Sequence, residues 1–313
     1  MRPRMSLIRP EYHPLDRVPK QDVLALVTFG GGMAGNDLLS FDVPIPQIGP
    51  PIAEVWRAKG EVVRETRGGI DIARTDDVLF GTIRARGRSD ETAFDVYESI
   101  VEVCRGSGYA NLWRIWNHVG GINEDEECLE RYKRFSTGRH EALTSHGYSK
   151  ERFPAASAVG MSEPGLLVYF IAGRQEGLQA ENPRQVSAYD YPPQYGPRSP
   201  SFSRATVVDG GLIFVSGTAS VVGHETRHSG NAVRQLEETI ENLDVTIGAA
   251  AARIGRTASA RDLTVAKIYL RSGVDQRELE PRLREVFSSL LVLQSDICRR
   301  ELLLEIEGIA ILE

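Results

Sequence analysis

Two glutamates near the end of the chain carry the clearest chemical signal in the sequence. Glu305 and Glu307 lie in an apolar run at 302–312 that is typical of a β-strand, where side chains two residues apart share one face. A carboxyl group among apolar neighbours loses solvation, so its neutral form persists to higher pH. Such a group can act as a general acid near neutral pH. The residues alone also fit an edge strand with two solvated glutamates.

A set of cationic and polar residues could form a pocket for a small anion. Residues 195–220 begin with a Gly-Pro turn, continue as a strand at 205–208, turn at 209–211 and return as a second strand. Arginine suits carboxylates, because its planar guanidinium can bind both oxygens at once. The residues that we expect to line this pocket are Arg198, Arg204, Arg271, Tyr195, Ser216 and Gly217. Taken singly, each of them also fits an ordinary surface, packing or capping role.

Apolar periodicity indicates the same order of elements in both halves of the chain. In the first half we expect a hairpin at 72–85, a helix at 93–103, a strand at 112–116, a helix at 124–146 and a strand at 166–172. The second half repeats this order at 204–219, 233–247, 263–270, 279–290 and 302–312. We therefore predict an α+β fold with two tandem ββαβαβ units, each a mixed sheet with helices on one face, in domains 1–175 and 176–313.

The composition restricts the class of partner. The chain has 313 residues and a formal net charge of −6, which argues against nucleic acid or an anionic membrane as the main partner. No apolar run approaches the roughly 20 residues of a membrane span, and we expect no secretory leader. The three cysteines form no CxxC pair, which is typical of a reducing cytoplasm. The histidines show no HExxH motif, so we expect neither a metal nor an organic cofactor.

Three short motifs, taken in order, resemble the YjgF/RidA-like superfamily. They are GPRS at 196–199, FVSG at 214–217 and EIEGIAI at 305–311. The longer string AYDYPPQYGPRSPSFSRA at 188–205, with a further domain in front of it, resembles more narrowly the chorismatases, which cleave the enolpyruvyl ether of chorismate. The resemblance implies chorismate as substrate, release of pyruvate without a cofactor, Glu305 as the catalytic acid and a structural role for Glu307.

The expected product depends on two further residues. Gly211 at the hairpin and Cys298, seven residues before Glu305, resemble the chorismatases that form 3-hydroxybenzoate. The resemblance assigns ring opening to Cys298 and space for the ring to Gly211. The residues themselves also fit an inert buried cysteine and an ordinary turn glycine. Hydrolysis of chorismate to a dihydroxycyclohexadiene carboxylate, an imine deaminase and a non-enzymatic carboxylate-binding protein stay open as alternatives, and the resemblance leaves open a homo-trimer.

Overall fold

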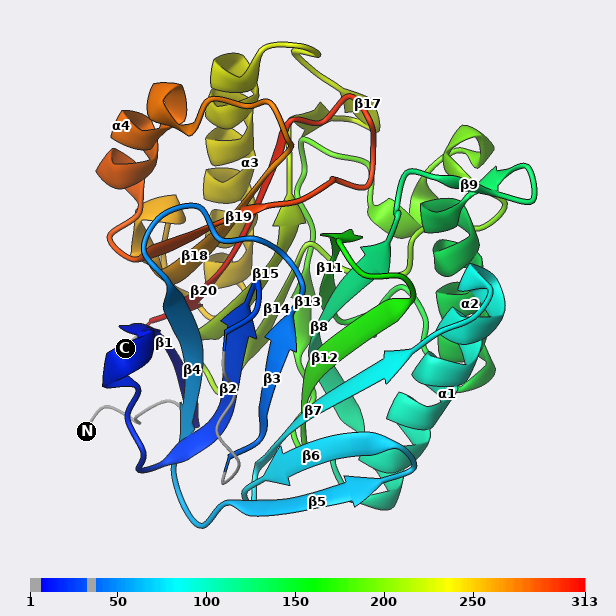
Figure 1. The fold of residues 1–313 in the computed structure, drawn as a ribbon, viewed down its shortest axis with the longest axis vertical. Coiled ribbons are helices and arrows are strands. Elements are labelled where there is room, and N and C mark those ends of the chain that lie inside the picture. Colours follow the sequence, from blue (N-terminus) through cyan, green and yellow to red (C-terminus); the bar gives the residue numbers. More distant parts are fainter. Residues whose placement is uncertain (1–6, 33–37, 313) are drawn as a thin grey trace.

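The computed structural model describes residues 7–32 and 38–312, and within these residues three large β-sheets lie at the centre with four α-helices on the outside (Figure 1). The first sheet has the strand order β1-β4-β2-β3. Its strands are β1 (Ile8–Pro14), β2 (Val23–Phe29), β3 (Ser40–Val43) and β4 (Ile52–Ala58). Every side chain of β2 is buried, which explains its continuous apolar sequence VLALVTF.

The second sheet has six strands in the order β11-β8-β12-β7-β6-β5 and belongs to the first repeated unit. The strands are β5 (Val63–Arg67), β6 (Ile70–Arg74), β7 (Val78–Ala85), β8 (Asn111–Gly120), β11 (Ala155–Met161) and β12 (Leu166–Gly173). Helices α1 (Ser89–Gly106) and α2 (Arg131–Ser145) pack on one face, and buried α1 side chains at Ala93, Val96, Ile100 and Val103 follow the expected helical spacing.

The third sheet repeats this arrangement with the order β13-β14-β15-β20-β18-β19. Its strands are β13 (Leu178–Ala180), β14 (Ala205–Val208), β15 (Leu212–Thr218), β18 (Leu263–Leu270), β19 (Leu290–Gln294) and β20 (Leu304–Ile311). Helices α3 (Ala232–Ala252) and α4 (Gln276–Val286) cover one face. Strand orders that match position by position confirm the duplicated α+β architecture with mixed sheets and helices on one face.

The sheet of each unit has two strands more than the predicted ββαβαβ order. The additional strands are β5 and β11 in the first unit and β13 and β19 in the second, and β11 and β19 pair in parallel with β8 and β18. Leu290 begins β19, so the prediction that the second helix of the later unit extends to this residue was wrong. The predicted helix at 124–146 was also too long, because a small hairpin of β9 (Asp125–Glu126) and β10 (Leu129–Glu130) precedes α2.

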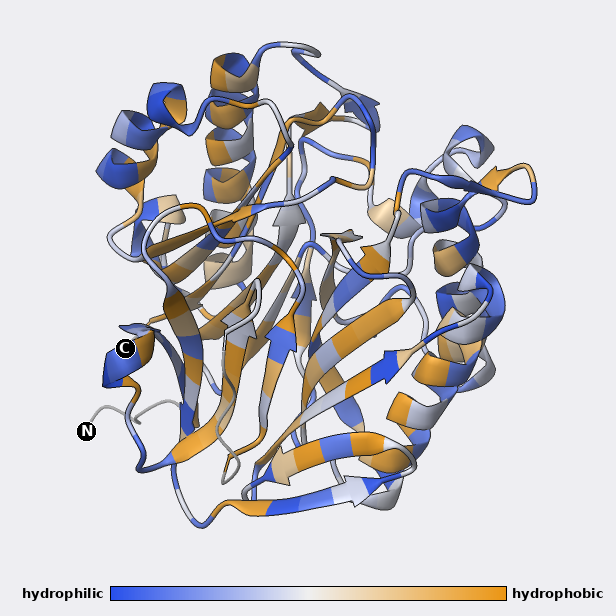
Figure 2. Cartoon of the chain, in the orientation of Figure 1, coloured by the Kyte–Doolittle hydropathy of each residue, from blue (hydrophilic) through white to orange (hydrophobic). Residues whose placement is uncertain are grey.

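One hydrophobic core joins the inner faces of the three sheets. The ring of Trp56 on β4 lies 5.5 Å from that of Trp116 on β8 and 6.5 Å from that of Phe214 on β15, measured between centroids. Figure 2 shows the inward strands as largely hydrophobic, while the helices alternate hydrophobic and hydrophilic bands. The division into domains 1–175 and 176–313 therefore stays a prediction, because the same core crosses that boundary.

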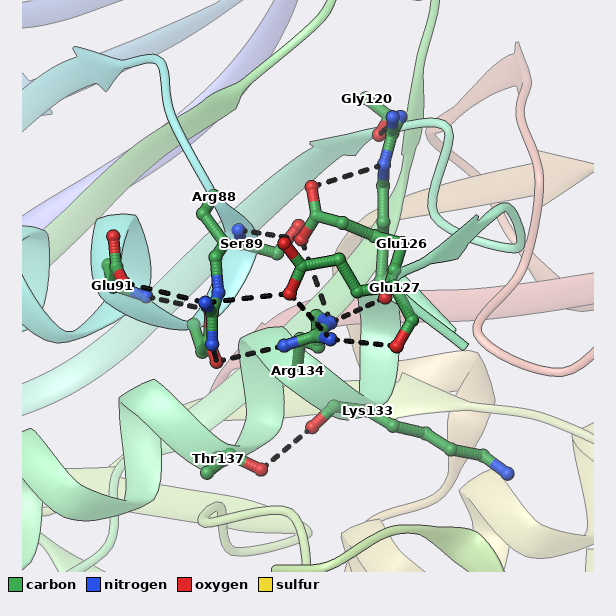
Figure 3. Close-up of polar contacts among 11 residues, drawn as sticks. Arg88, Ser89, Glu91, Gly120, Glu126, Glu127, Lys133, Arg134 and Thr137 are labelled. Atoms are coloured by element: carbon green, nitrogen blue, oxygen red, sulfur yellow. Dashed lines mark hydrogen bonds and ion pairs between the residues drawn. The ribbon is translucent and has the colours of Figure 1, made fainter. Parts of the chain in front are cut away.

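The small hairpin fixes the position of α2. The Arg134 guanidinium donates to the backbone oxygens of Glu126 at 2.7 Å and Glu127 at 3.1 Å (Figure 3). The carboxylate of Glu126 accepts the backbone N–H of Ser89 at 2.9 Å, at the start of α1. These contacts connect the hairpin to both α1 and α2. In the described part of the chain, no helix is long and apolar enough to cross a membrane.

Candidate active site

A pocket with a volume of about 270 Å³ lies between the two units. It forms where β11 of the first unit runs beside β15 of the second, and two hydrogen bonds join these strands. Ser216 Oγ accepts the N–H of Ala156, and Ser157 Oγ accepts the N–H of Gly217, both at 2.9 Å. The first unit contributes Tyr132, Lys133, Arg139 and Ser157 to the lining, and the second contributes Tyr191, Tyr195, Arg204, Gly217, Cys298 and Glu305.

Glu305 lies in this pocket with only 4 % of its surface exposed. The pairing of β15 with β20 is irregular between Val215 and Thr218, next to the Glu305 carboxyl group. A Cβ at Gly217 would overlap Oε1 of Glu305, so the carboxyl lies directly against the bare Cα. Burial, together with repulsion from Glu307, raises the pKa of Glu305 to about 8. Glu305 is therefore protonated at neutral pH and can donate that proton.

Glu307 shares the same face of β20 but has the opposite charge state. It does not line the pocket, and it forms buried ion pairs with Arg114 at 2.6 Å and Lys267 at 3.2 Å. Burial acts to raise the pKa of Glu307, but Lys267 and Arg114 more than compensate and lower it below its usual range. Two carboxyl groups whose environments separate their pKa values in this way are typical of an acid and its fixed anionic neighbour.

Two arginines, one from each unit, present unsatisfied donors at the pocket. Arg139 on α2 is 1 % exposed, and its Nε and one Nη lack a hydrogen-bond partner. Arg204 is 5 % exposed; it donates to Tyr191 Oη at 2.7 Å, while its Nε lacks a partner. Both guanidinium groups lie over the ring of Phe202, at 5.8 and 5.3 Å from its centroid. Buried donors without partners are costly, so this arrangement is suited to an anionic ligand.

An aromatic segment, residues 188–203, closes one side of the pocket. The Tyr195 hydroxyl donates to the backbone oxygen of His224 at 2.7 Å, and the Arg299 guanidinium lies 4.0 Å from the Tyr195 ring centroid. Lys133 Nζ donates to the backbone oxygen of Gln194 at 3.3 Å, which ties this segment to α2. The segment therefore supplies stacking surfaces, while its backbone is held by both units.

Cys298 lies in the pocket on the loop that precedes β20. Burial is the main cause, and the nearby Glu305 carboxyl the second, that raises the pKa of its thiol to about 12. Cys298 is therefore a neutral S–H group near pH 7, and it can exchange a proton but is a poor nucleophile in this state. Within the described residues, no group of three or more His, Cys, Asp or Glu side chains could hold a metal ion.

Comparison with known proteins supports one family for this chain. The family model described as "Chorismatase FkbO/Hyg5-like, N-terminal" matches residues 54–172. The 3-hydroxybenzoate synthase of Streptomyces hygroscopicus is 38% identical over 276 residues, which is 83% of this chain and 81% of that protein. A chorismatase of Streptomyces rapamycinicus is 39% identical over 274 residues, or 82% and 81% of the two chains. The chain belongs to the chorismatase family.

The fold agrees over nearly the whole chorismatase chain. A crystal structure of a chorismatase covers 97% of this chain and 98% of its own, with a TM-score of 0.89 and 32% sequence identity. The agreement therefore includes both repeated units and the four-stranded sheet before them. The resemblance to chorismatases that the motifs at 188–205 and 305–311 indicated is confirmed.

Several predicted site residues of this chorismatase lie away from the pocket. Arg198 is exposed and does not line the pocket. Arg271 donates to Asp296 at 2.5 Å and to the backbone oxygens of Leu302 and Arg299 at 2.9 and 3.0 Å, so it holds the Cys298 loop and does not face a ligand. Neither Arg198 nor Arg271 therefore lines the pocket in this structure.

Ser216 and Gly211 have structural explanations. Ser216 is fully buried, and its hydroxyl donates to the backbone oxygen of Ser203 at 2.5 Å. The same hydroxyl accepts the N–H of Ala156, and this hydrogen bond joins β15 to β11. Gly211 directly precedes β15, whereas Gly217 lies near the other end of that strand. The two glycines are six residues apart along an extended chain, which corresponds to roughly 20 Å. A Cβ at Gly211 would overlap the backbone oxygen of Leu312, which explains the glycine. The structure does not bring either residue to the pocket.

The sequence reasoning missed the contribution of the first unit. Arg139, Tyr132, Lys133 and Ser157 lie on α2 and β11, which carry no recognised motif. One signal was available for Arg139. It occupies the same helical face as Phe135, Ala142 and Leu143, where a lone arginine in an otherwise apolar stripe is unusual unless it has a partner.

Proposed function

We propose that this chain converts chorismate to 3-hydroxybenzoate and pyruvate. The observation that carries the proposal is a protonated, buried Glu305 in the same pocket as two buried arginines with unpartnered N–H groups. Chorismate has two carboxylates and an acid-sensitive enol ether, so its groups match this set. The 38% identity to a 3-hydroxybenzoate synthase supports the same product.

The two arginines suggest the direction in which the substrate binds. Arg204 lowers the pKa of Glu305, so its guanidinium is close to the acid. Arg139 belongs to the other unit, and its guanidinium and that of Arg204 both lie over the ring of Phe202. The acid must reach the methylene of the enolpyruvyl group, whose carboxylate is therefore nearer to Arg204. We assign the enolpyruvyl carboxylate to Arg204 and the ring carboxylate to Arg139. The aromatic side chains of Tyr191 and Tyr195 then border the ring.

The reaction begins with transfer of the Glu305 proton to the enolpyruvyl methylene carbon. The new C–H bond leaves a cationic carbon stabilised by the ether oxygen, and this makes pyruvate a leaving group. The neighbouring ring hydroxyl displaces pyruvate by forming an epoxide, and its proton returns to Glu305. Opening of the epoxide with loss of a ring proton gives the aromatic product. Every atom of chorismate appears in 3-hydroxybenzoate or pyruvate, so this route consumes no water.

Cys298 is the group that we assign to epoxide opening. Its neutral thiol lies in the pocket close enough to Glu305 for this carboxyl group to contribute to the raised pKa of the thiol. A weak S–H acid can protonate the epoxide oxygen while the ring loses its proton. Hydrolysis becomes the alternative outcome when water reaches the intermediate first, and it yields the dihydroxycyclohexadiene carboxylate.

Chorismate consumption should match pyruvate formation one to one, without added metal or nucleotide. The proton comes from Glu305, and the nucleophile comes from the substrate, so no other reactant is needed. The test combines a lactate dehydrogenase assay for pyruvate with chromatography of the aromatic product, in the presence and absence of EDTA. Binding of chorismate without turnover would favour a carboxylate-binding protein, and release of ammonia from an imine without pyruvate release from chorismate would favour a deaminase.

Cys298→Ala should shift the product from 3-hydroxybenzoate toward the hydrolysis diol while pyruvate release continues. Glu305 still activates the enol ether in this variant, but the intermediate lacks the thiol that directs it to the aromatic. Chromatography of the product mixture measures the ratio, and Cys104→Ala is the matched control because Cys104 is buried away from the pocket. A Cys298→Ala enzyme that forms only 3-hydroxybenzoate at the parental rate would reduce Cys298 to a packing residue.

We further propose a small-molecule partner in a reducing cytoplasm. Cys104, Cys128 and Cys298 are all free thiols, as expected for such a compartment. The net charge of −6 fits a small substrate better than nucleic acid or an anionic membrane. The homo-trimer that the superfamily resemblance implies stays a prediction.

A further inference from the structure

Glu307 is held by an unusually large set of donors directly behind the active site. Five side chains donate to its two oxygens: Trp116, Tyr269 and Lys267 to Oε1 at 2.8, 3.1 and 3.2 Å, and Arg114 and Ser157 to Oε2, the arginine at 2.6 Å. A carboxylate offers about four lone-pair sites, and its protonated form offers fewer. Only the ionised form of Glu307 therefore fits these donors.

Ser157 connects this fixed anion to the pocket. Its hydroxyl donates to Glu307 and accepts the N–H of Gly217 at 2.9 Å. Gly217 in turn supplies the surface against which the Glu305 carboxyl lies, since a Cβ there would overlap Oε1 of Glu305. The two glutamates are also two residues apart on one face of β20, so they lie roughly 7 Å apart along the strand.

Glu307 supplies the negative charge that acts most strongly on Glu305. The other acidic groups around Glu305 are Cys298 on its loop, Tyr132 on α2 and Tyr269 on β18. Burial raises the pKa of each of these three groups, so all are neutral near pH 7. The cations that face Glu305 are Arg114 on β8 and Arg204 before β14. The pocket glutamates Glu130 and Glu301 act on Cys298.

We propose that Glu307 is a positioning residue of this active site: its ionised carboxylate, held by donors from both units, adds to burial in keeping Glu305 in its acid form and acts through Ser157 on the Gly217 peptide. This inference rests on the proposed function of Glu305 as the proton donor. It also gives the first unit a part in holding the acid in its reactive form, because Arg114, Trp116 and Ser157 belong to that unit.

Glu307→Gln should move the basic limb of the pH profile of kcat/KM to lower pH by about one unit or more. This limb follows deprotonation of Glu305 in the free enzyme, and loss of a neighbouring negative charge makes that deprotonation easier. Glu54→Gln is the matched control. Glu54 is an equally buried carboxylate that pairs with Lys267 at 2.6 Å, but it belongs to β4 and does not contribute to the protonation of Glu305. Its basic limb should remain at the parental pH.

The proposal is overturned if folded Glu307→Gln keeps the basic limb of its kcat/KM profile at the parental pH. It is also overturned if Glu54→Gln moves this limb by the same amount as Glu307→Gln. If Glu307→Gln fails to fold, the triple variant Glu54→Gln/Lys267→Met/Glu307→Gln replaces it, because it removes the buried ammonium group together with both carboxylates that pair with it, and neither Glu54 nor Lys267 acts on Glu305. If that variant also fails, Ser157→Ala decides the question. It should lower kcat by about tenfold with little change in KM, and a parental kcat would contradict the proposal.

An infrared measurement separates this proposal from the proposed function. The band of the protonated Glu305 carboxyl is identified by its absence in Glu305→Gln, and its titration is followed without substrate. A band that titrates at lower pH in Glu307→Gln supports the tuning by Glu307 even if the chain does not turn over chorismate. A band with the parental midpoint refutes the tuning even if pyruvate is formed.

Discussion

Glu305→Gln should lower the turnover of chorismate by a factor on the order of 10²–10⁴ and leave the affinity for 3-hydroxybenzoate nearly unchanged. The amide preserves the shape of the side chain against Gly217 but has no acidic proton to transfer to the enolpyruvyl methylene. The parental rate should fall as the pH rises through about 8, because Glu305 then loses the proton that the reaction needs. That decline should be missing from the residual activity of the variant.

The measurement is a pH profile of pyruvate release, with affinity for 3-hydroxybenzoate determined separately by calorimetry. Glu54→Gln again serves as the control, since it removes a buried carboxylate from the same core but outside the pocket. A Glu305→Gln enzyme with at least half of the parental turnover would show that another group donates the proton. Loss of both turnover and ligand affinity would point to a collapsed pocket.

Parts of the second unit were predictable because their local signals are strong. The turn at 209–211, the strand at 263–270 and the glutamates on the last strand each follow from residue type and spacing, and β18 has the predicted bounds. The prediction that Glu305 would lie in an apolar environment agrees with its 4 % exposure. Its role as the catalytic acid stays a proposal.

The rest of the site depends on contacts between distant segments. Strand β11 reads AASAVGM, and its small residues give little β-strand signal, although close approach of β15 requires them. Ser157 therefore went unnoticed. Arg271 follows the correct strand, but the sequence does not show that Asp296 and backbone oxygens occupy its donors. Whether an arginine is free for a ligand is a property of the packed loop.

Arg139→Ala should weaken the binding of 3-hydroxybenzoate by roughly 30-fold to several thousand-fold, which corresponds to about 2–5 kcal/mol. This product retains only the ring carboxylate, so removal of its assigned partner leaves that charge unpaired in a desolvated pocket. Arg204→Ala should have a much smaller effect on 3-hydroxybenzoate but should raise the KM for chorismate, because its assigned partner is the enolpyruvyl carboxylate. Calorimetry with 3-hydroxybenzoate and steady-state kinetics with chorismate measure the two effects.

Arg198→Ala is the control for both variants, because Arg198 is an exposed arginine of the 188–203 segment and does not line the pocket. Its affinity for 3-hydroxybenzoate should match that of the parent. If Arg204→Ala weakens the binding of 3-hydroxybenzoate and Arg139→Ala does not, the substrate binds in the opposite direction. Parental affinity in both variants would contradict the proposed anion site itself, since the unpartnered N–H groups of Arg139 and Arg204 are the observation on which that site depends.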